Sequence, residues 1–293
     1  MNRRHFLVIF LLVALIAIPA AADHSWENYH WARTSNPFTL KVHDNVGGTW
    51  DAYLQEAAAD WSASPVLDLD ATYPPLSNVK RCASASGRIE ACNSKYGNTG
   101  WLGIAGISIS GSHITKAYTK VNDTYFNTAT YNTPAWRRLV MCQEIAHDFG
   151  LDHQDETFDN ANLGSCMDYT NDPDGGAGGA VNNDPSNEHP NAHDFEQIQT
   201  IYSHLDSTTT ISGVISAMAS AAARVPTAGE LLADADQWGT PVRYDKAGRP
   251  NVFVRPMGVG HDGLLQMDVT HVFWAPIDPF ELPEEGDNGR QIR

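Results

Sequence analysis

The chain has 293 residues, which is enough for one large domain or two modest ones and for a core that needs no special staples. Hydrophobic residues make up 42% of the chain and charged residues 18%, a composition that is typical of a globular protein and argues against a disordered or repetitive one. Acidic residues outnumber basic residues by 35 to 19 and the formal net charge is −16, so we expect no nucleic-acid partner and no binding to anionic membranes.

The first residues have the pattern of an export signal. Arg3 and Arg4 precede an unbroken apolar run over 6–18, which is followed by Pro19 and three alanines. This run is shorter than the about 20 residues that span a bilayer, so the pattern favours a cleaved secretory signal peptide over 1–22 rather than a membrane anchor. We therefore expect a secreted protein, extracellular or periplasmic, with no membrane contact after the signal is removed.

An exported chain can form disulfide bonds, and this one has four cysteines. They are Cys82, Cys92, Cys142 and Cys166, and four cysteines allow three pairings. Proximity in the sequence favours Cys82 with Cys92, which leaves Cys142 with Cys166. The rival interpretation of the second pair is two thiolate metal ligands.

Strands and helices follow one another through the first half of the chain, according to the spacing of apolar residues. In chain order the predicted elements are a strand over 38–42, a helix over 49–63, and strands over 66–70, 101–109 and 113–121. A further helix is expected over 133–149. Thr133 can cap its first turn, Pro134 suits its first position, and Gly150 ends it.

A long surface loop is expected over 172–191, where Gly, Pro, Asn and Asp dominate, and a third helix over 191–205. Oxygen-bearing side chains crowd this part of the chain: Asp168, Asp172, Asp174, Asn182, Asn183 and Asp184. Such loops can hold Ca²⁺, but the spacing matches no EF-hand or repeat, so a solvated loop is the stronger interpretation.

The composition changes after Asp206. An Ala- and Ser-rich piece leads to short strand-like runs over 251–254 and 269–274, and then to an acidic tail. The sequence thus predicts a functional domain over 23–206 and a separate C-terminal appendage of unknown role over 207–293.

The segment from Cys142 to His153, C-Q-E-I-A-H-D-F-G-L-D-H, carries the residues that point to chemistry. Gln143 and His147 are four residues apart, so they share one face of a helix and can meet one ion. The bend at Gly150 allows His153 to return to the same point. Two imidazoles, a third group and an open position form the arrangement of a catalytic zinc site.

This segment resembles the long zinc signature of the metzincin metallopeptidases, H-E-x-x-H-x-x-G-x-x-H, with Gln143 in place of the first histidine. The residues S-C-M-D-Y over 165–169 resemble the family's methionine-containing turn, with Met167 as its methionine. The S-x-M-x-Y form is most similar to the astacin and serralysin branches, in which the tyrosine that Tyr169 matches ligates zinc or stabilises the oxyanion. The resemblance covers about residues 133–170 and extends to secreted bacterial metzincin-like proteins with Gln in the first position.

The resemblance implies an α+β fold, with a metzincin-like twisted mixed sheet, an active-site helix and a Met-turn. It also implies one catalytic Zn²⁺, with Gln143, His147 and His153 as ligands. Glu144 is then the general base that takes a proton from the water activated by the metal, and Tyr169 helps to stabilise the oxyanion.

The expected function is that of a secreted zinc-dependent endopeptidase, a monomer whose partner is a protein or peptide substrate. The family implies that the scissile peptide lies extended along an edge strand, for which 101–109 is the candidate. Cys142 and Cys166 directly precede Gln143 and Met167, so a disulfide between them would fix the metal-bearing helix to the turn.

Gln143 leaves alternatives open, because an amide oxygen suits zinc less well than an imidazole nitrogen. Gln143 is a ligand of a working enzyme, or the ion is held by the two histidines and another group: Tyr169, His189 or His193. In a third alternative, the protein is a catalytically inactive relative that binds proteins or glycans through the same cleft. Glu144 favours the enzyme, since a purely structural site needs no carboxylate there.

Overall fold

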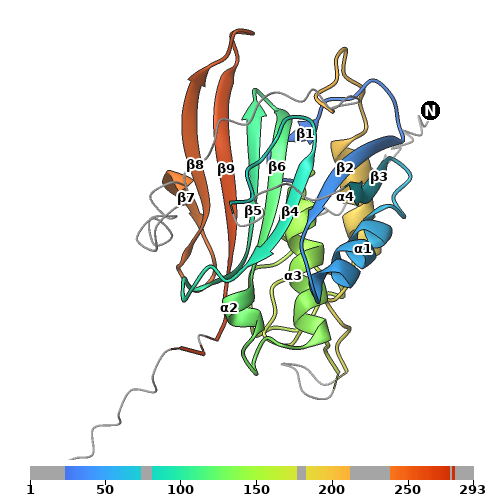
Figure 1. Cartoon of the computed structure of the whole chain (residues 1–293). Coiled ribbons are helices and arrows are strands. Elements are labelled where there is room, and N and C mark those ends of the chain that lie inside the picture. Colours follow the sequence, from blue (N-terminus) through green and yellow to red (C-terminus); the bar gives the residue numbers. More distant parts are fainter. Residues whose placement is uncertain (1–23, 74–80, 177–182, 212–237, 278, 281–293) are drawn as a thin grey trace, which may run out of the picture.

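The computed structural model describes residues 24–73, 81–176, 183–211, 238–277 and 279–280 (Figure 1). The predicted signal peptide over 1–22 lies outside the described residues, as does most of the Ala- and Ser-rich piece after Asp206. The elements in chain order are β1 (His30–Trp31), β2 (Phe38–Asn45), α1 (Trp50–Trp61), β3 (Leu67–Tyr73), β4 (Ile89–Ser94), β5 (Trp101–Ser110), β6 (His113–Asn122), α2 (Asp123–Phe126), α3 (Pro134–His147), α4 (Ala192–Ile201), β7 (Thr240–Tyr244), β8 (Pro250–Val259) and β9 (Leu265–Trp274).

One large mixed sheet organises the described part of the chain, which confirms the predicted α+β class. The strand order is β3-β2-β4-β6-β5-β9-β8-β7, and the short β1 pairs with β6. The neighbours β3, β2, β4 and β6 are parallel, whereas β5, β9, β8 and β7 continue the sheet as antiparallel strands. In Figure 1, α1, α3 and α4 lie together beside the parallel half of the sheet. The core between them is rich in buried Trp, including Trp31, Trp50 and Trp61.

The helix α3 begins and ends as its sequence predicts. The Thr133 hydroxyl accepts a hydrogen bond from the Trp136 amide at 3.3 Å, and Pro134 occupies the first turn. After the helix, Gly150 has φ 101°, and a Cβ there would lie 2.2 Å from the Tyr29 carbonyl oxygen. Only glycine therefore allows the chain to turn here against the segment before β1.

The C-terminal strands belong to the same sheet as the rest of the described chain. Strand β9 pairs antiparallel with β5 from Trp101↔Trp274 to Ser110↔Gln266. The expectation that 101–109 forms an edge strand is therefore wrong: β5 has a partner strand on each side, β6 and β9. The described strands of 207–293 cover one side of β5 and bring their own side chains to the face of α3.

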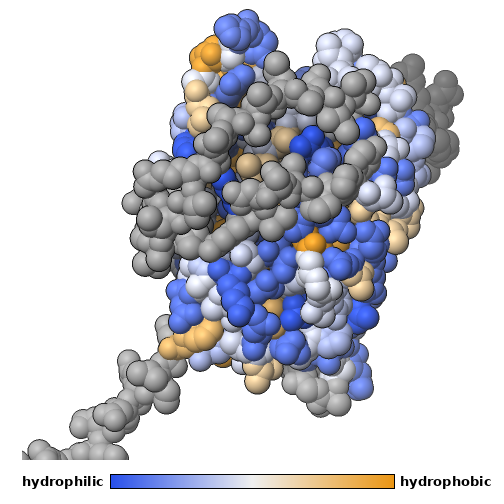
Figure 2. Space-filling model, in the orientation of Figure 1, coloured by the Kyte–Doolittle hydropathy of each residue, from blue (hydrophilic) through white to orange (hydrophobic). Residues whose placement is uncertain are grey.

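Both predicted disulfides are present, Cys82–Cys92 and Cys142–Cys166. The second pair joins α3 to the turn over 165–169, so these two cysteines are not thiolate ligands. Figure 2 shows a largely hydrophilic surface on the visible face, in keeping with the net charge of −16.

Candidate metal centre

Three histidines meet between α3 and the sheet: two that are six residues apart in the sequence and a third from the distant strand β9. His147 is the last residue of α3, His153 follows the bend at Gly150, and His271 comes from β9. One ring nitrogen of each lies within 4.8 Å of the others, and the rings of His147 and His271 stack at 4.2 Å. His147 and His271 are fully buried and His153 is 8% exposed. The structure thus assembles three imidazoles where the sequence predicted two.

The hydrogen bonds of two of these rings fix which nitrogen is free. The Nδ1 atom of His147 donates to the Leu151 carbonyl at 2.8 Å, and Nδ1 of His153 lies 3.0 Å from a Glu156 carboxylate oxygen. Each Nε2 atom then carries a lone pair, and the two Nε2 atoms face each other at 3.1 Å. Ligands at about 2.0–2.1 Å around a tetrahedral zinc lie about 3.3 Å apart, so this spacing suits a shared ion. Hydrogen bonds from the outer ring nitrogen to oxygen acceptors are the usual support of metal-binding histidines.

His271 contributes the third ring of the cluster from β9. Its Nδ1 atom is buried without a hydrogen-bond partner in the described part of the chain, and its Nε2 atom lies 3.3 Å from the Arg243 guanidinium. Trp26 packs edge-on against both His147 and His271, at 5.7 and 5.8 Å between ring centres. The indole ring of Trp26 therefore shields the rings of His147 and His271 from water.

Burial keeps the imidazoles of His147 and His271 neutral. Desolvation, with a smaller contribution from neighbouring His153, lowers the pKa of His147 to about 3. Burial likewise lowers the pKa of His271 well below its usual value. A neutral imidazole has a lone pair for a cation, so the cluster could hold a metal ion at neutral pH.

Glu144, one turn before His147, is fully buried in α3. Neither of its carboxylate oxygens has a hydrogen-bond partner among the described residues. Burial, and then the nearby Asp148, raise the pKa of Glu144 well above the usual value of a glutamate. An unpaired buried carboxyl group costs stability, and such groups are typical of sites with a chemical task.

The turn over 165–169 lies where the sequence predicted it, next to the histidines. Met167 is fully buried, and its amide donates to the Ser165 hydroxyl at 2.9 Å. The ring of Tyr169 lies 4.2 Å from the ring of His153 and stacks on Phe273 at 4.8 Å. The Tyr169 hydroxyl is buried near the side chain of Asn251, and burial raises its pKa well above the usual value.

Gln143 makes a structural contact. Its amide nitrogen donates to the Cys166 carbonyl at 2.9 Å, which ties α3 to the turn a second time, beside the Cys142–Cys166 disulfide. The amide oxygen of Gln143 is buried without a hydrogen-bond partner within the described ranges, so its role as a metal ligand stays a prediction.

The two other candidate ligands from the sequence lie elsewhere. His189 contacts Asp60, with Nδ1 2.7 Å from a carboxylate oxygen. His193 packs against His24, at 4.8 Å between ring centres. Neither belongs to a potential metal cluster in the described part of the chain. Sequence reasoning missed His271 instead, whose only signal is a lone histidine within the apolar run V-T-H-V-F-W.

A cavity of about 390 Å³ opens onto the cluster from the His153 side. Its lining includes Asp152, Glu156 and Arg243. The Arg243 guanidinium donates to both oxygens of Asp152, one of them at 2.6 Å, and lies 3.4 Å from Glu156. Positive charge around this cavity comes from Arg243 and Lys246, and negative charge comes from Asp152, Asp155 and Glu156.

The chain matches no model of a known protein family and no curated protein. Its two disulfides indicate an oxidising environment, extracellular or periplasmic. Over the described ranges, no helix is both long and apolar enough to cross a bilayer. Function must therefore be inferred from the chemistry of the site itself.

Proposed function

We propose that the protein is a secreted, metzincin-like zinc peptidase whose metal is held by His147, His153 and His271. The observation that supports this most is the pair of Nε2 lone pairs, which face each other at 3.1 Å while both Nδ1 atoms are engaged. Three imidazoles form the protein's donor set of a catalytic zinc site, which leaves the fourth position for water or substrate. The cavity at His153 is the side from which water and substrate would reach it.

Glu144 is the proposed general base. Its carboxylate is buried one helical turn from His147, and no neighbour within the described residues occupies its oxygens. A cation among the histidines would favour the ionised form and offset the effect of burial on its pKa. The carboxylate could then accept a proton from water and pass it to the leaving amine.

A bound zinc ion would supply a water of lowered pKa and polarise the substrate carbonyl. Tyr169 would assist by donating a hydrogen bond from its hydroxyl to the developing oxyanion, since its ring packs against His153.

One observation favours a second candidate, a zinc-containing relative without activity that binds proteins or glycans. Strand β9 occupies the side of β5 along which an extended peptide would pair, so a substrate cannot add to the sheet there. Under the peptidase hypothesis the substrate must instead approach through the cavity bordered by Glu156 and Arg243.

The two candidates differ in what Glu144 does. With zinc-loaded protein and a general protein substrate, we expect Glu144→Gln to lower the rate by about 10²–10⁴-fold without changing the bound zinc. Glu196→Gln on the exposed side of α4 is the matched control and should leave the rate unchanged. Activity that survives Glu144→Gln would remove this mechanism, and a zinc-loaded wild type without activity would support the binding protein.

A further inference from the structure

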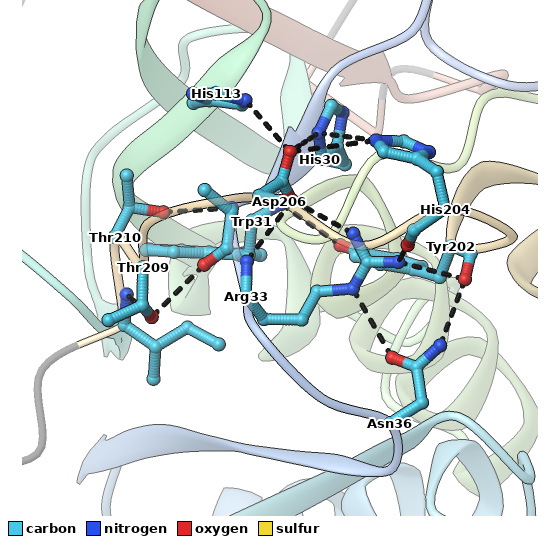
Figure 3. A network of polar contacts seen from close by, with 12 residues as sticks. His30, Trp31, Arg33, Asn36, His113, Tyr202, His204, Asp206, Thr209 and Thr210 are labelled. Carbon is cyan, nitrogen blue, oxygen red and sulfur yellow. Dashed lines mark hydrogen bonds and ion pairs between the residues drawn. The ribbon is translucent and has the colours of Figure 1, made fainter.

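A second group of histidines lies away from the candidate metal centre, around Asp206 (Figure 3). His30 belongs to β1, His113 begins β6, and His204 and Asp206 follow α4. Three segments that are far apart in the sequence therefore place their side chains around one carboxylate. Oxygen Oδ1 of Asp206 lies 3.2 Å from Nε2 of His113, 3.5 Å from Nε2 of His30 and 3.7 Å from Nε2 of His204.

Four of the six separations between these four atoms match the edges of a tetrahedral zinc site. The Nε2 atoms of His204 and His30 are 3.1 Å apart, and the ring nitrogen of His113 lies within 4.8 Å of that of His30. Zinc with ligands at about 2.0–2.1 Å sets its ligand atoms about 3.3 Å apart. Four measured separations between 3.1 and 3.7 Å are grouped around that value.

Neighbouring groups hold two of the four ligands in the orientation that a metal needs. Nδ1 of His30 donates to the Asn28 carbonyl at 2.7 Å, which leaves the Nε2 lone pair directed at the cluster. Oxygen Oδ2 of Asp206 accepts from the side chain of Arg33 at 3.0 Å and from its amide at 3.2 Å, which leaves Oδ1 free to face the histidines. Figure 3 shows the contact between Arg33 and Asp206 on the side of the carboxylate away from the three rings. Such outer hydrogen bonds are the usual support of metal ligands.

We propose that His30, His113, His204 and Asp206 form a second zinc site, with a structural role. Three imidazoles and one carboxylate oxygen suit zinc rather than Ca²⁺ or Mg²⁺, which prefer oxygen ligands alone. All four positions are filled by the protein, and a closed set of four ligands is typical of a structural rather than a catalytic zinc ion. The partial exposure of His113 and His204 gives the ion a path from solvent.

A zinc ion at this site would stabilise the packing of β1 against β6 and the chain after α4. Strand β1 has only two residues, paired with His113 and Ile114 of β6. The chain after α4 is held to the same segment by Arg33–Asp206 and by the Thr210 hydroxyl, which accepts from the Ala32 amide at 3.0 Å. A shared ion would add a bond between β1, β6 and the end of α4, and would stabilise the folded state by binding to it alone.

Zinc counting tests this independently of activity. We expect two zinc ions per chain in the wild type and one in His113→Ala/His204→Ala. The double variant should also melt at a lower temperature, and zinc binding at this site should no longer raise its melting temperature. His261→Ala, in the exposed turn between β8 and β9, is the control and should keep both ions. A double variant that binds as much zinc as the wild type would overturn the proposal.

Variants that lack His271 distinguish this site from the proposed catalytic site. In His271→Ala, one ion should remain, and adding His204→Ala should weaken its binding by about 100-fold or more. The single His204 change removes the most exposed ligand of the four and so disturbs folding least. If His271→Ala binds no zinc although it is folded, the second site is wrong; if it keeps two ions, the catalytic site is wrong instead.

Discussion

A Cβ atom at Gly103 would lie 2.5 Å from Oε1 of Glu144. Gly103 stands in the interior strand β5, so the backbone of the sheet itself forms the wall against which the carboxylate rests. The absence of a side chain at this position is what allows a glutamate to occupy the space between α3 and the sheet.

Gly103→Ala should therefore displace Glu144 without touching a proposed ligand. We expect a loss of peptidase activity of about 10²-fold or more, because the general base must lie within hydrogen-bond reach of its water, while zinc content is retained. Activity on a protein substrate and zinc content, measured on the same sample, check this. Full activity in Gly103→Ala would show that the position of Glu144 does not matter for the reaction.

The roles of Gln143 and His271 can be separated by zinc affinity. The ring of His271 stacks on that of His147, so His271→Ala should weaken zinc binding at the catalytic centre by about 100-fold or more. Gln143 instead donates its amide to the Cys166 carbonyl. Gln143→Ala should change zinc binding by less than about tenfold. Competition with a chromophoric chelator measures both constants. The reverse order would make Gln143 the third ligand and His271 a neighbour.

The Cys142–Cys166 disulfide should stabilise the fold and also the metal centre. The chain-entropy model gives about 3.5 kcal/mol for a loop of about 25 residues and about 2.7 kcal/mol for the loop between Cys82 and Cys92. Replacing either pair by alanine should lower the free energy of unfolding by amounts of this order in denaturant titrations. Only the Cys142/Cys166 change should also weaken zinc binding, because only this pair joins α3 to the turn over 165–169. Equal zinc affinities in the two variants would contradict this coupling.

The stability of the fold should depend on the protonation of His43 in β2. Burial, with the nearby cations Arg88 and Lys41, lowers the pKa of His43 to about 4, although Glu90 lies 3.9 Å away. The unfolded chain binds this proton near pH 6.5, so the contribution of His43 is fully present above pH 6.5 and is lost as the pH falls toward 4.

His43→Gln should thus flatten the pH dependence of the free energy of unfolding between pH 4 and 6.5. A pKa difference of about 2.5 units corresponds to about 3 kcal/mol across this range. Urea titrations of wild type and variant at several pH values give the difference directly. Parallel curves would mean that His43 titrates alike in the folded and unfolded chain.

Features that depend on residues close together in the sequence, such as the ends of a helix, could be predicted from the sequence. Thr133 and Gly150 mark the two ends of α3 because capping side chains and glycines with a positive φ can be recognised from residue type alone. The same segment carries His147 and His153, so their meeting could be foreseen from helix geometry and one bend.

Contacts between distant strands have no such local signal. Nothing in the residues of β9 indicates that it pairs with β5, so His271 could not be assigned to the cluster and β5 was expected at an edge. The pattern of β4 is also poorly alternating, and its six residues were not expected to form a strand. Pairing over long stretches of chain depends on the whole set of competing partners, and short-range spacing does not encode it.

The position of His271 in β9, the most C-terminal strand of the described residues, has a consequence for how the protein matures. A nascent chain that has emerged only as far as α4 offers two of the three proposed imidazoles, and a fragment cleaved before β9 would have the same deficit. If the protein is the proposed peptidase, it would become active only after β9 has paired with β5.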